Sequence, residues 1–202
     1  MGTSPECVRK MCERREAMKV LLLNASPKKT GATQEILRTV EEALPKATCG
    51  ELVCLGDYQV QYCLGCKTCY QSGCCVHQDD MPVLLDKMDE ADVLVIAAPS
   101  YWADVPGQLK VFIDRCTPFG DTNPDPHRHT LKPEKRCYAI ALRTGVRPGE
   151  CQHIIDTIDH WCGHMGVEMA GSLYFCQIEG KEDIDRHKPA IREKTAEWFG
   201  GD

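Results

Sequence analysis

Cysteines crowd one short segment of this sequence: five of the chain's fourteen lie between Cys63 and Cys75. Three of them follow the pattern C-x-x-C-x-x-C, which is a recurrent way to supply three thiolate ligands to a [4Fe-4S] cluster. Thiolates also hold zinc, and the same side chains can remain free thiols or pair as a disulfide. In a chain of 202 residues this density predicts metal or redox chemistry rather than the stapling of a small secreted domain.

A second segment with chemical potential runs from Asn24 to Thr33 and reads NASPKKTGAT. It joins an apolar run to a helical pattern, so hydroxyls, lysines and the free amides of a helix N-terminus meet there. Such groups bind a phosphate monoester. The segment has the spacing of neither a Walker loop nor a dinucleotide-binding G-x-G-x-x-G. The alternative is an ordinary turn in which Thr33 caps the helix.

Two further segments could contact a flat ligand. Tyr101 and Trp102 follow a buried apolar run, so their rings could pack beside a heteroaromatic group or could simply seal the end of the core. The segment from Arg143 to Gly149 follows the next apolar run, and Gly145 there can bring the backbone close to a ligand. That segment could equally be a simple turn.

Hydrophobic periodicity predicts the elements that position these segments. Continuous or alternating apolar runs predict five strands, at residues 20–23, 51–55, 92–98, 137–142 and 167–175. Helical spacing predicts helices at residues 36–44, 81–88, 106–116, 152–165 and 183–199, with a proline-rich loop at 118–133. Alternating strands and helices indicate a doubly wound α/β domain, whose ligands bind beyond the carboxyl ends of the strands. The three segments 24–33, 99–105 and 143–149 share that end.

The first loop resembles that of the NADPH-dependent FMN reductase family, in the flavodoxin-like superfamily, which reads Gly-Ser-Pro-Arg-x-x-Gly-x-Thr. Ser26, Pro27, Gly31 and Thr33 match in order, with Lys28 in place of arginine. The later stretch PSYWADVPGQLKVFIDR resembles the Pro-x-Tyr-Trp motif of the same family and the helix that follows it. The resemblance implies a five-stranded parallel sheet of order 2-1-3-4-5 with helices on both faces, and FMN as the cofactor.

The resemblance and the loops together assign twelve residues to FMN. They are Ser26, Lys28, Thr30, Gly31, Ala32, Thr33, Pro99, Ser100, Tyr101, Trp102, Thr144 and Gly145. By the same resemblance, Lys110, Asp114 and Arg115 are expected to hold the helix and subunit contacts. No side chain is assigned to proton transfer, because the cofactor supplies the chemistry.

The cysteine segment resembles the iron-sulfur flavoprotein group of that family, in which the motif is followed by Val-x-x-Asp-Asp-Met. Val76, Asp79, Asp80 and Met81 complete the match. The resemblance implies four cluster ligands, namely Cys63, Cys66, Cys69 and Cys75. The adjacent carboxylates are expected to cap the helix that begins at Met81 rather than to act as an acid/base pair.

Composition narrows the remaining possibilities. A formal net charge of -6 argues against nucleic-acid binding, and the apolar runs are too short to span a membrane. The N-terminus has no apolar stretch typical of a signal peptide, so a cytoplasmic location is expected. We predict an extension at residues 1–18 and one FMN-binding domain at 19–202, with a cysteine-rich loop at 58–81.

The expected function is that of an FMN-dependent NAD(P)H oxidoreductase with a small or protein electron acceptor, assembled as a homodimer or homotetramer. A non-enzymatic FMN electron carrier is the first alternative. A thiol-redox or zinc-binding protein without flavin is the second. His160 and His164 share a helical face from which Cys162 points away, which favours surface histidines over a metal site. The scattered cysteines are expected in the core, namely Cys49, Cys54, Cys116, Cys137, Cys162 and Cys176.

Overall fold

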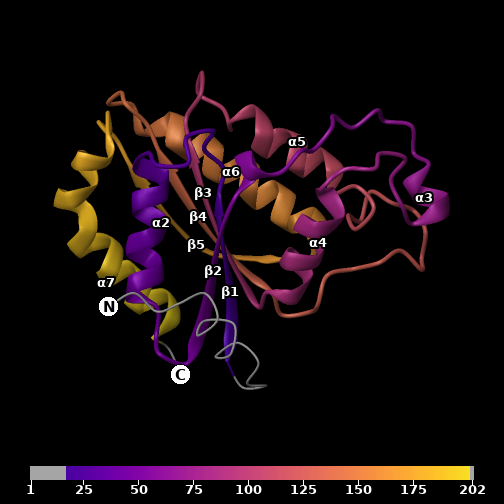
Figure 1. Cartoon of the computed structure of the whole chain (residues 1–202), viewed down its shortest axis with the longest axis horizontal. Coiled ribbons are helices and arrows are strands. Elements are labelled where there is room, and N and C mark those ends of the chain that lie inside the picture. Colours follow the sequence, from indigo (N-terminus) through magenta and orange to yellow (C-terminus); the bar gives the residue numbers. More distant parts are fainter. Residues whose placement is uncertain (1–16, 201–202) are drawn as a thin grey trace.

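A parallel sheet of five strands organises the protein, whose computed structural model describes residues 17–200. The strands are β1 (Met18–Asn24), β2 (Thr48–Cys54), β3 (Val93–Pro99), β4 (Arg136–Leu142) and β5 (Glu168–Phe175). They lie in the order β2-β1-β3-β4-β5 and every pair is parallel (Figure 1). The predicted fold class and strand order are therefore confirmed. The order reverses between β1 and β3, which is where ligands of such sheets bind.

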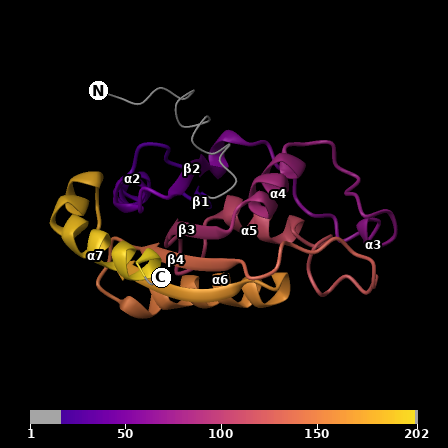
Figure 2. The same cartoon turned by 90° about the horizontal axis from the view of Figure 1, so that it is seen from below.

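Helices cover both faces of the sheet (Figures 1 and 2). One face packs against α2 (Ala32–Ala43) and α7 (Lys188–Phe199), and the other against α4 (Met81–Glu90), α5 (Gly107–Arg115) and α6 (Pro148–Met165). The central strands are buried on both sides, so their side chains divide alternately between two apolar cores. Each fully buried aliphatic side chain contributes about 1.5–3 kcal/mol through removal from water. This rigid sheet fixes the strand ends that carry the loops.

Several element boundaries differ from the prediction. The last predicted helix is two elements, a 3-10 helix η2 (Lys181–His187) and α7, in which Pro189 occupies the first turn. Proline fits the first turn of a helix because its missing N–H is not needed there. Two short elements were not predicted: η1 (Leu55–Asp57) and α3 (Cys69–Ser72). The predicted loop at residues 118–133 contains no helix or strand.

The predicted N-terminal extension falls almost wholly outside the described residues, and β1 already begins at Met18. Cys54, Cys116, Cys137 and Cys162 are buried, as expected of core thiols, whereas Cys49 and Cys176 are half-buried. Within residues 17–200, no helix is both long and apolar enough to span a bilayer.

Candidate functional site

A cleft of about 160 Å³ lies at the carboxyl end of the sheet, where the loops after β1, β3 and β4 meet. Nine of the twelve residues assigned to FMN line it: Ser26, Lys28, Gly31, Ala32, Thr33, Pro99, Ser100, Tyr101 and Thr144. Thr30, Trp102 and Gly145 are not among the lining residues. Three segments that are distant in sequence thus converge on one cleft.

The N-terminus of α2 opens into this cleft. Gly31 is the N-cap residue and offers no side-chain cap, so the first amides of the helix have no side-chain acceptor. Thr33 is buried in the first turn and is not the cap that the alternative interpretation required. Free helix amides carry a partial positive charge and are suited to a phosphate group.

Buried hydrogen bonds beneath the loop hold it in shape. Asn24 is fully buried, and its Oδ1 accepts a hydrogen bond from the Ser26 amide at 2.8 Å. Its Nδ2 donates to Gln34 Oε1 at 2.7 Å, which links the end of β1 to α2. The Ser26 hydroxyl in turn accepts from the Lys28 amide at 3.1 Å. Because buried polar groups are costly to leave unpaired, this network fixes the path of the loop.

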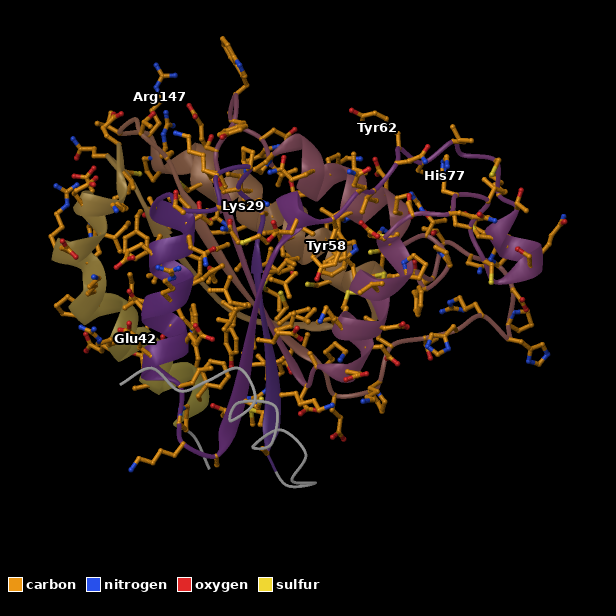
Figure 3. All side chains as sticks on the ribbon, in the orientation of Figure 1. Lys29, Glu42, Tyr58, Tyr62, His77 and Arg147 are labelled. Carbon is orange, nitrogen blue, oxygen red and sulfur yellow. The ribbon has the colours of Figure 1, made fainter. Side chains whose placement is uncertain are left out.

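The two lysines of the loop have different roles. Lys29 pairs with Asp57 and lies near the end of β1, on the upper side of the sheet in Figure 3. Lys28 lines the cleft and has no ion-pair partner among residues 17–200. Arg143 and Lys181 also line the cleft, against one carboxylate, Glu179. Arg143 is paired with Glu150, so Lys28 and Lys181 against Glu179 leave one excess cation, which favours an anionic ligand.

Arg143 was not predicted and follows directly on β4. Its guanidinium pairs with Glu150 at 2.6 Å and donates to the Arg147 carbonyl at 2.9 Å. The same guanidinium lies over Gly145, so a side chain at that position would require the arginine to move. Its Nε is buried and has no hydrogen-bond partner. The position of Arg143, directly before Thr144 at a strand end, was the signal available in the sequence.

The loop after β5 also lines the cleft, although no role for this loop was expected from the sequence. Its contributing residues are Ile178, Glu179, Gly180 and Lys181. Because β5 is parallel to β4, its carboxyl end reaches the same edge of the sheet. The sequence therefore contained a positional signal for this loop, but no ligand-binding pattern.

The segment after β3 projects from the upper edge of the sheet in Figure 1. Tyr101 and Asp104 pair there as an isolated antiparallel bridge around a tight turn. Trp102 and Ala103, at the turn, have φ of 54° and 65°, which is left-handed backbone that side chains rarely adopt. Trp102 is fully exposed, and Tyr101 is 42% exposed. Neither ring seals the core.

Tyr62 and His77 of the cysteine-rich loop lie to the right of Lys29 in Figure 3, and no residue of that loop lines the cleft. The ends of that loop are tied together by Asp79, whose two carboxylate oxygens each accept two hydrogen bonds. Oδ2 accepts from the Gln61 amide and Arg115 Nη1, at 2.9 and 2.6 Å. Oδ1 accepts from the Met81 amide and Arg115 Nη2, both at 3.1 Å.

This ion pair is buried, with 1% of the Arg115 side chain and 3% of the Asp79 side chain exposed. The hydrogen bonds from Arg115 lower the pKa of Asp79 from 3.8 to about 2. The N-cap residue of α4 is Asp80, whose side chain makes no cap bond and instead accepts the Gln59 amide. Only Asp79 meets the expectation in part, because it accepts the amide of Met81 in the first turn. The expectation that Arg115 makes subunit contacts is wrong, because its charge is used inside the chain.

The predicted cluster ligands are free thiols: Cys63 and Cys66 are exposed, and Cys69 and Cys75 half-buried. Hydrogen bonds from Thr68 lower the pKa of Cys66. Burial, followed by the nearby thiols of the other three, raises the pKa of Cys69, so all four belong to one neighbourhood. They are not, however, arranged to hold a metal: no group of three or more potential ligands is found in the described part of the chain.

Comparisons with known proteins identify the family. The family described as NADPH-dependent FMN reductase matches residues 18–175. A protein described as an iron-sulfur flavoprotein, from Archaeoglobus fulgidus, is 36% identical over 185 residues, which cover 90% of this chain and 80% of that protein. An FMN-dependent NADH:quinone oxidoreductase from Chromobacterium violaceum is 37% identical over 102 residues, or 48% of this chain and 46% of that protein.

Among solved structures, an FMN-dependent NADH-azoreductase from Bacillus anthracis, in complex with FMN, superposes with a TM-score of 0.66. It is 16% identical and the match covers 90% of this chain and 99% of that one, so the likeness shows the fold. The family match extends from β1 to the end of β5 and thus includes the whole sheet. This chain belongs to the NADPH-dependent FMN reductase family.

Proposed function

We propose that the chain is an FMN-dependent NAD(P)H oxidoreductase and that the cleft after β1, β3 and β4 binds FMN. The observation that carries this proposal is the convergence of uncapped α2 amides, the unpaired Lys28 and the Ser26 hydroxyl in one cationic cleft. FMN held there would supply the redox chemistry, namely transfer of a hydride from a nicotinamide and of electrons singly or in pairs to an acceptor. The residues of the chain supply binding and orientation.

Each part of the cleft has its own task in this proposal. The α2 amides, Ser26, Lys28 and Thr33 hold the phosphate, and the Asn24 network keeps their loop in place. Arg143 holds the loop after β4 through its hydrogen bond to the Arg147 carbonyl and its ion pair with Glu150. The cleft encloses about 160 Å³, less than the roughly 300 Å³ or more typical of complete small-molecule sites. In this proposal the cleft takes the phosphate end of FMN, and the flavin ring lies beyond it, open to its electron partners.

FMN affinity tests the phosphate site. Lys28→Ala should weaken FMN binding about 10- to 100-fold, because a charge-assisted hydrogen bond is worth about 1.5–3 kcal/mol. Lys29→Ala is the matched control, since its side chain pairs with Asp57 and does not line the cleft. Quenching of flavin fluorescence measures both dissociation constants. Equal effects of the two substitutions would place the phosphate elsewhere.

Reduction by nicotinamides separates an enzyme from an electron carrier. Anaerobic mixing with NADH or NADPH should bleach the bound flavin, and the nicotinamide that bleaches it faster is the preferred electron donor. Quinones, azo dyes and free flavins are then offered as acceptors under steady-state conditions. A flavin that stays oxidised with both nicotinamides would favour a non-enzymatic carrier.

We also propose a homodimer or homotetramer in which Trp102 lies at a contact between subunits. Its support is the complete exposure of a large aromatic side chain on a turn with two left-handed residues. Trp102→Ser should lower the mass measured by light scattering after gel filtration. Tyr174→Ser is the control, because Tyr174 is also exposed but lies on the edge strand β5. A wild-type monomer would reject the proposal.

For the cysteine-rich loop we propose a [4Fe-4S] cluster held by Cys63, Cys66, Cys69 and Cys75. The support is their spacing, their shared neighbourhood around Cys69 and the likeness to proteins described as iron-sulfur flavoproteins. The thiols must draw closer together than they stand here, so assembly requires movement of the loop. Iron, sulfide and zinc analysis with visible absorption of anaerobically purified protein tests this. Zinc alone, or free thiols without iron, would contradict it.

A further inference from the structure

A second and larger cavity, of about 700 Å³, lies between α5, α6, the start of the cysteine-rich loop and residues 117–122. Three histidines of α6 line it, namely His153, His160 and His164. They fall on one helical face because their spacing follows the helix repeat. The flavin cleft shares no lining residue with this cavity.

Two of these histidines face each other at a distance typical of metal ligands. The Nε2 atoms of His160 and His164 are 3.2 Å apart, and the rings stand at 87°. Two nitrogens that bind zinc at about 2.0–2.1 Å in a tetrahedral arrangement lie roughly 3.3–3.4 Å apart. A metal ion could therefore replace the hydrogen between these rings with little movement of either side chain.

A carboxylate from another segment orients one of the imidazoles. Asp121 Oδ1 lies 2.6 Å from His164 Nδ1, and the Asp121 amide donates to the His164 carbonyl at 2.9 Å. A carboxylate can only accept, so His164 Nδ1 carries the hydrogen and the lone pair is on Nε2, which faces His160. This carboxylate–histidine arrangement is the one that supports metal-ligating histidines in proteins.

We propose that His160 and His164 form a binding site for a divalent transition metal ion, oriented by Asp121. Imidazole ligands suit zinc, nickel and copper rather than magnesium or calcium. The described residues provide no group of three ligands, so water completes the coordination from the side of the cavity. A bound ion bridges two side chains of α6, and Asp121 ties one of them to the segment after α5. The site does not depend on FMN.

Anomalous diffraction locates the ion independently of the many cysteines. Crystals of the full chain soaked in zinc chloride should show an anomalous peak about 2.0–2.3 Å from both Nε2 atoms. Peaks at the cysteine-rich loop do not bear on this site. A map with no peak at the imidazole pair would overturn the proposal.

Calorimetric titration with nickel tests the same site in solution. The double variant His160→Gln/His164→Gln should bind one fewer ion than the wild type. His153→Gln is the matched control, since it lines the same cavity on the same helix and should keep every site. Asp121→Asn should retain the site with about 10- to 100-fold weaker affinity. Identical stoichiometry in the double variant and the wild type would refute the site, and unchanged FMN content shows that each variant is folded.

Discussion

Replacement of Asp79 by asparagine is the sharpest test of how the cysteine-rich loop is held. Each carboxylate oxygen accepts two hydrogen bonds, one from a backbone amide and one from Arg115. Asparagine has one acceptor oxygen, so in either orientation its NH₂ group faces two donors. The substitution also leaves the Arg115 guanidinium buried without a counter-charge. Asp79→Asn thus keeps two of the four hydrogen bonds and places a donor against the other two donors.

Two independent figures set the expected loss of stability. Removal of one partner from a buried ion pair costs about 3–5 kcal/mol. The fall of the Asp79 pKa from 3.8 to about 2 corresponds to about 2 kcal/mol of stabilisation by the ionised form. We expect a loss of about 2–5 kcal/mol in the free energy of unfolding, which is a large share of the roughly 5–15 kcal/mol of a typical domain.

Urea unfolding followed by circular dichroism measures that loss, and hydrogen exchange at the Gln61 and Met81 amides shows whether opening is local. Asp80→Asn is the matched control, because Asp80 accepts a single bond from the Gln59 amide and asparagine retains an acceptor. The double variant Asp79→Leu/Arg115→Met should recover part of the loss, since no charge stays buried. An Asp79→Asn protein with unchanged unfolding and unchanged exchange would show that the ion pair does not hold the loop.

Three further outcomes are expected. Because the pKa of Asp79 is lowered in the folded protein, its contribution to the free energy of unfolding is present above pH 3.8 and is lost as the pH falls toward about 2. The free energy of unfolding, measured across this pH range, should therefore fall in the wild type and not in Asp79→Asn. Asn24→Leu removes the acceptor of the Ser26 amide, so it should weaken FMN binding about tenfold, measured by flavin fluorescence. Tyr138→Phe removes the buried 2.9 Å hydrogen bond that the tyrosine hydroxyl donates to the Trp198 carbonyl. It should lower the free energy of unfolding, measured by calorimetry, by about 1 kcal/mol.

The strands and the phosphate loop could be predicted because their signals are local. A continuous apolar run such as Val20–Leu23 indicates a strand that is covered on both faces, and the loop that follows then lies at the carboxyl end of that strand. The lining residues Ser26 and Thr33 follow from that placement. Arg143 and Lys181 did not follow, because single cations after a strand are too common to indicate a ligand.

The long-range pairs could not be predicted from the sequence. Arg115 was assigned to subunit contacts because its helix alone does not reveal that Asp79 lies beside its last turn. Asp121 and His164 are likewise 43 residues apart and meet only because the loop after α5 returns to the end of α6. Local pattern fixes which residues are buried or exposed, whereas the choice of polar partners depends on how loops close in space.

The turn at Trp102 holds a large aromatic side chain fully exposed on a backbone of unfavourable conformation. Left-handed backbone at two consecutive non-glycine residues costs on the order of 1–3 kcal/mol each, and such turns persist only where surrounding bonds hold them. Here the Tyr101–Asp104 bridge does so, and the Asp104 carboxylate also accepts the Val105 amide at 2.7 Å. Those bonds hold a large aromatic side chain in water at the same end of the sheet as the cleft, although Trp102 does not line that cleft. A strained turn that keeps such a ring exposed therefore supports the subunit contact proposed above for Trp102.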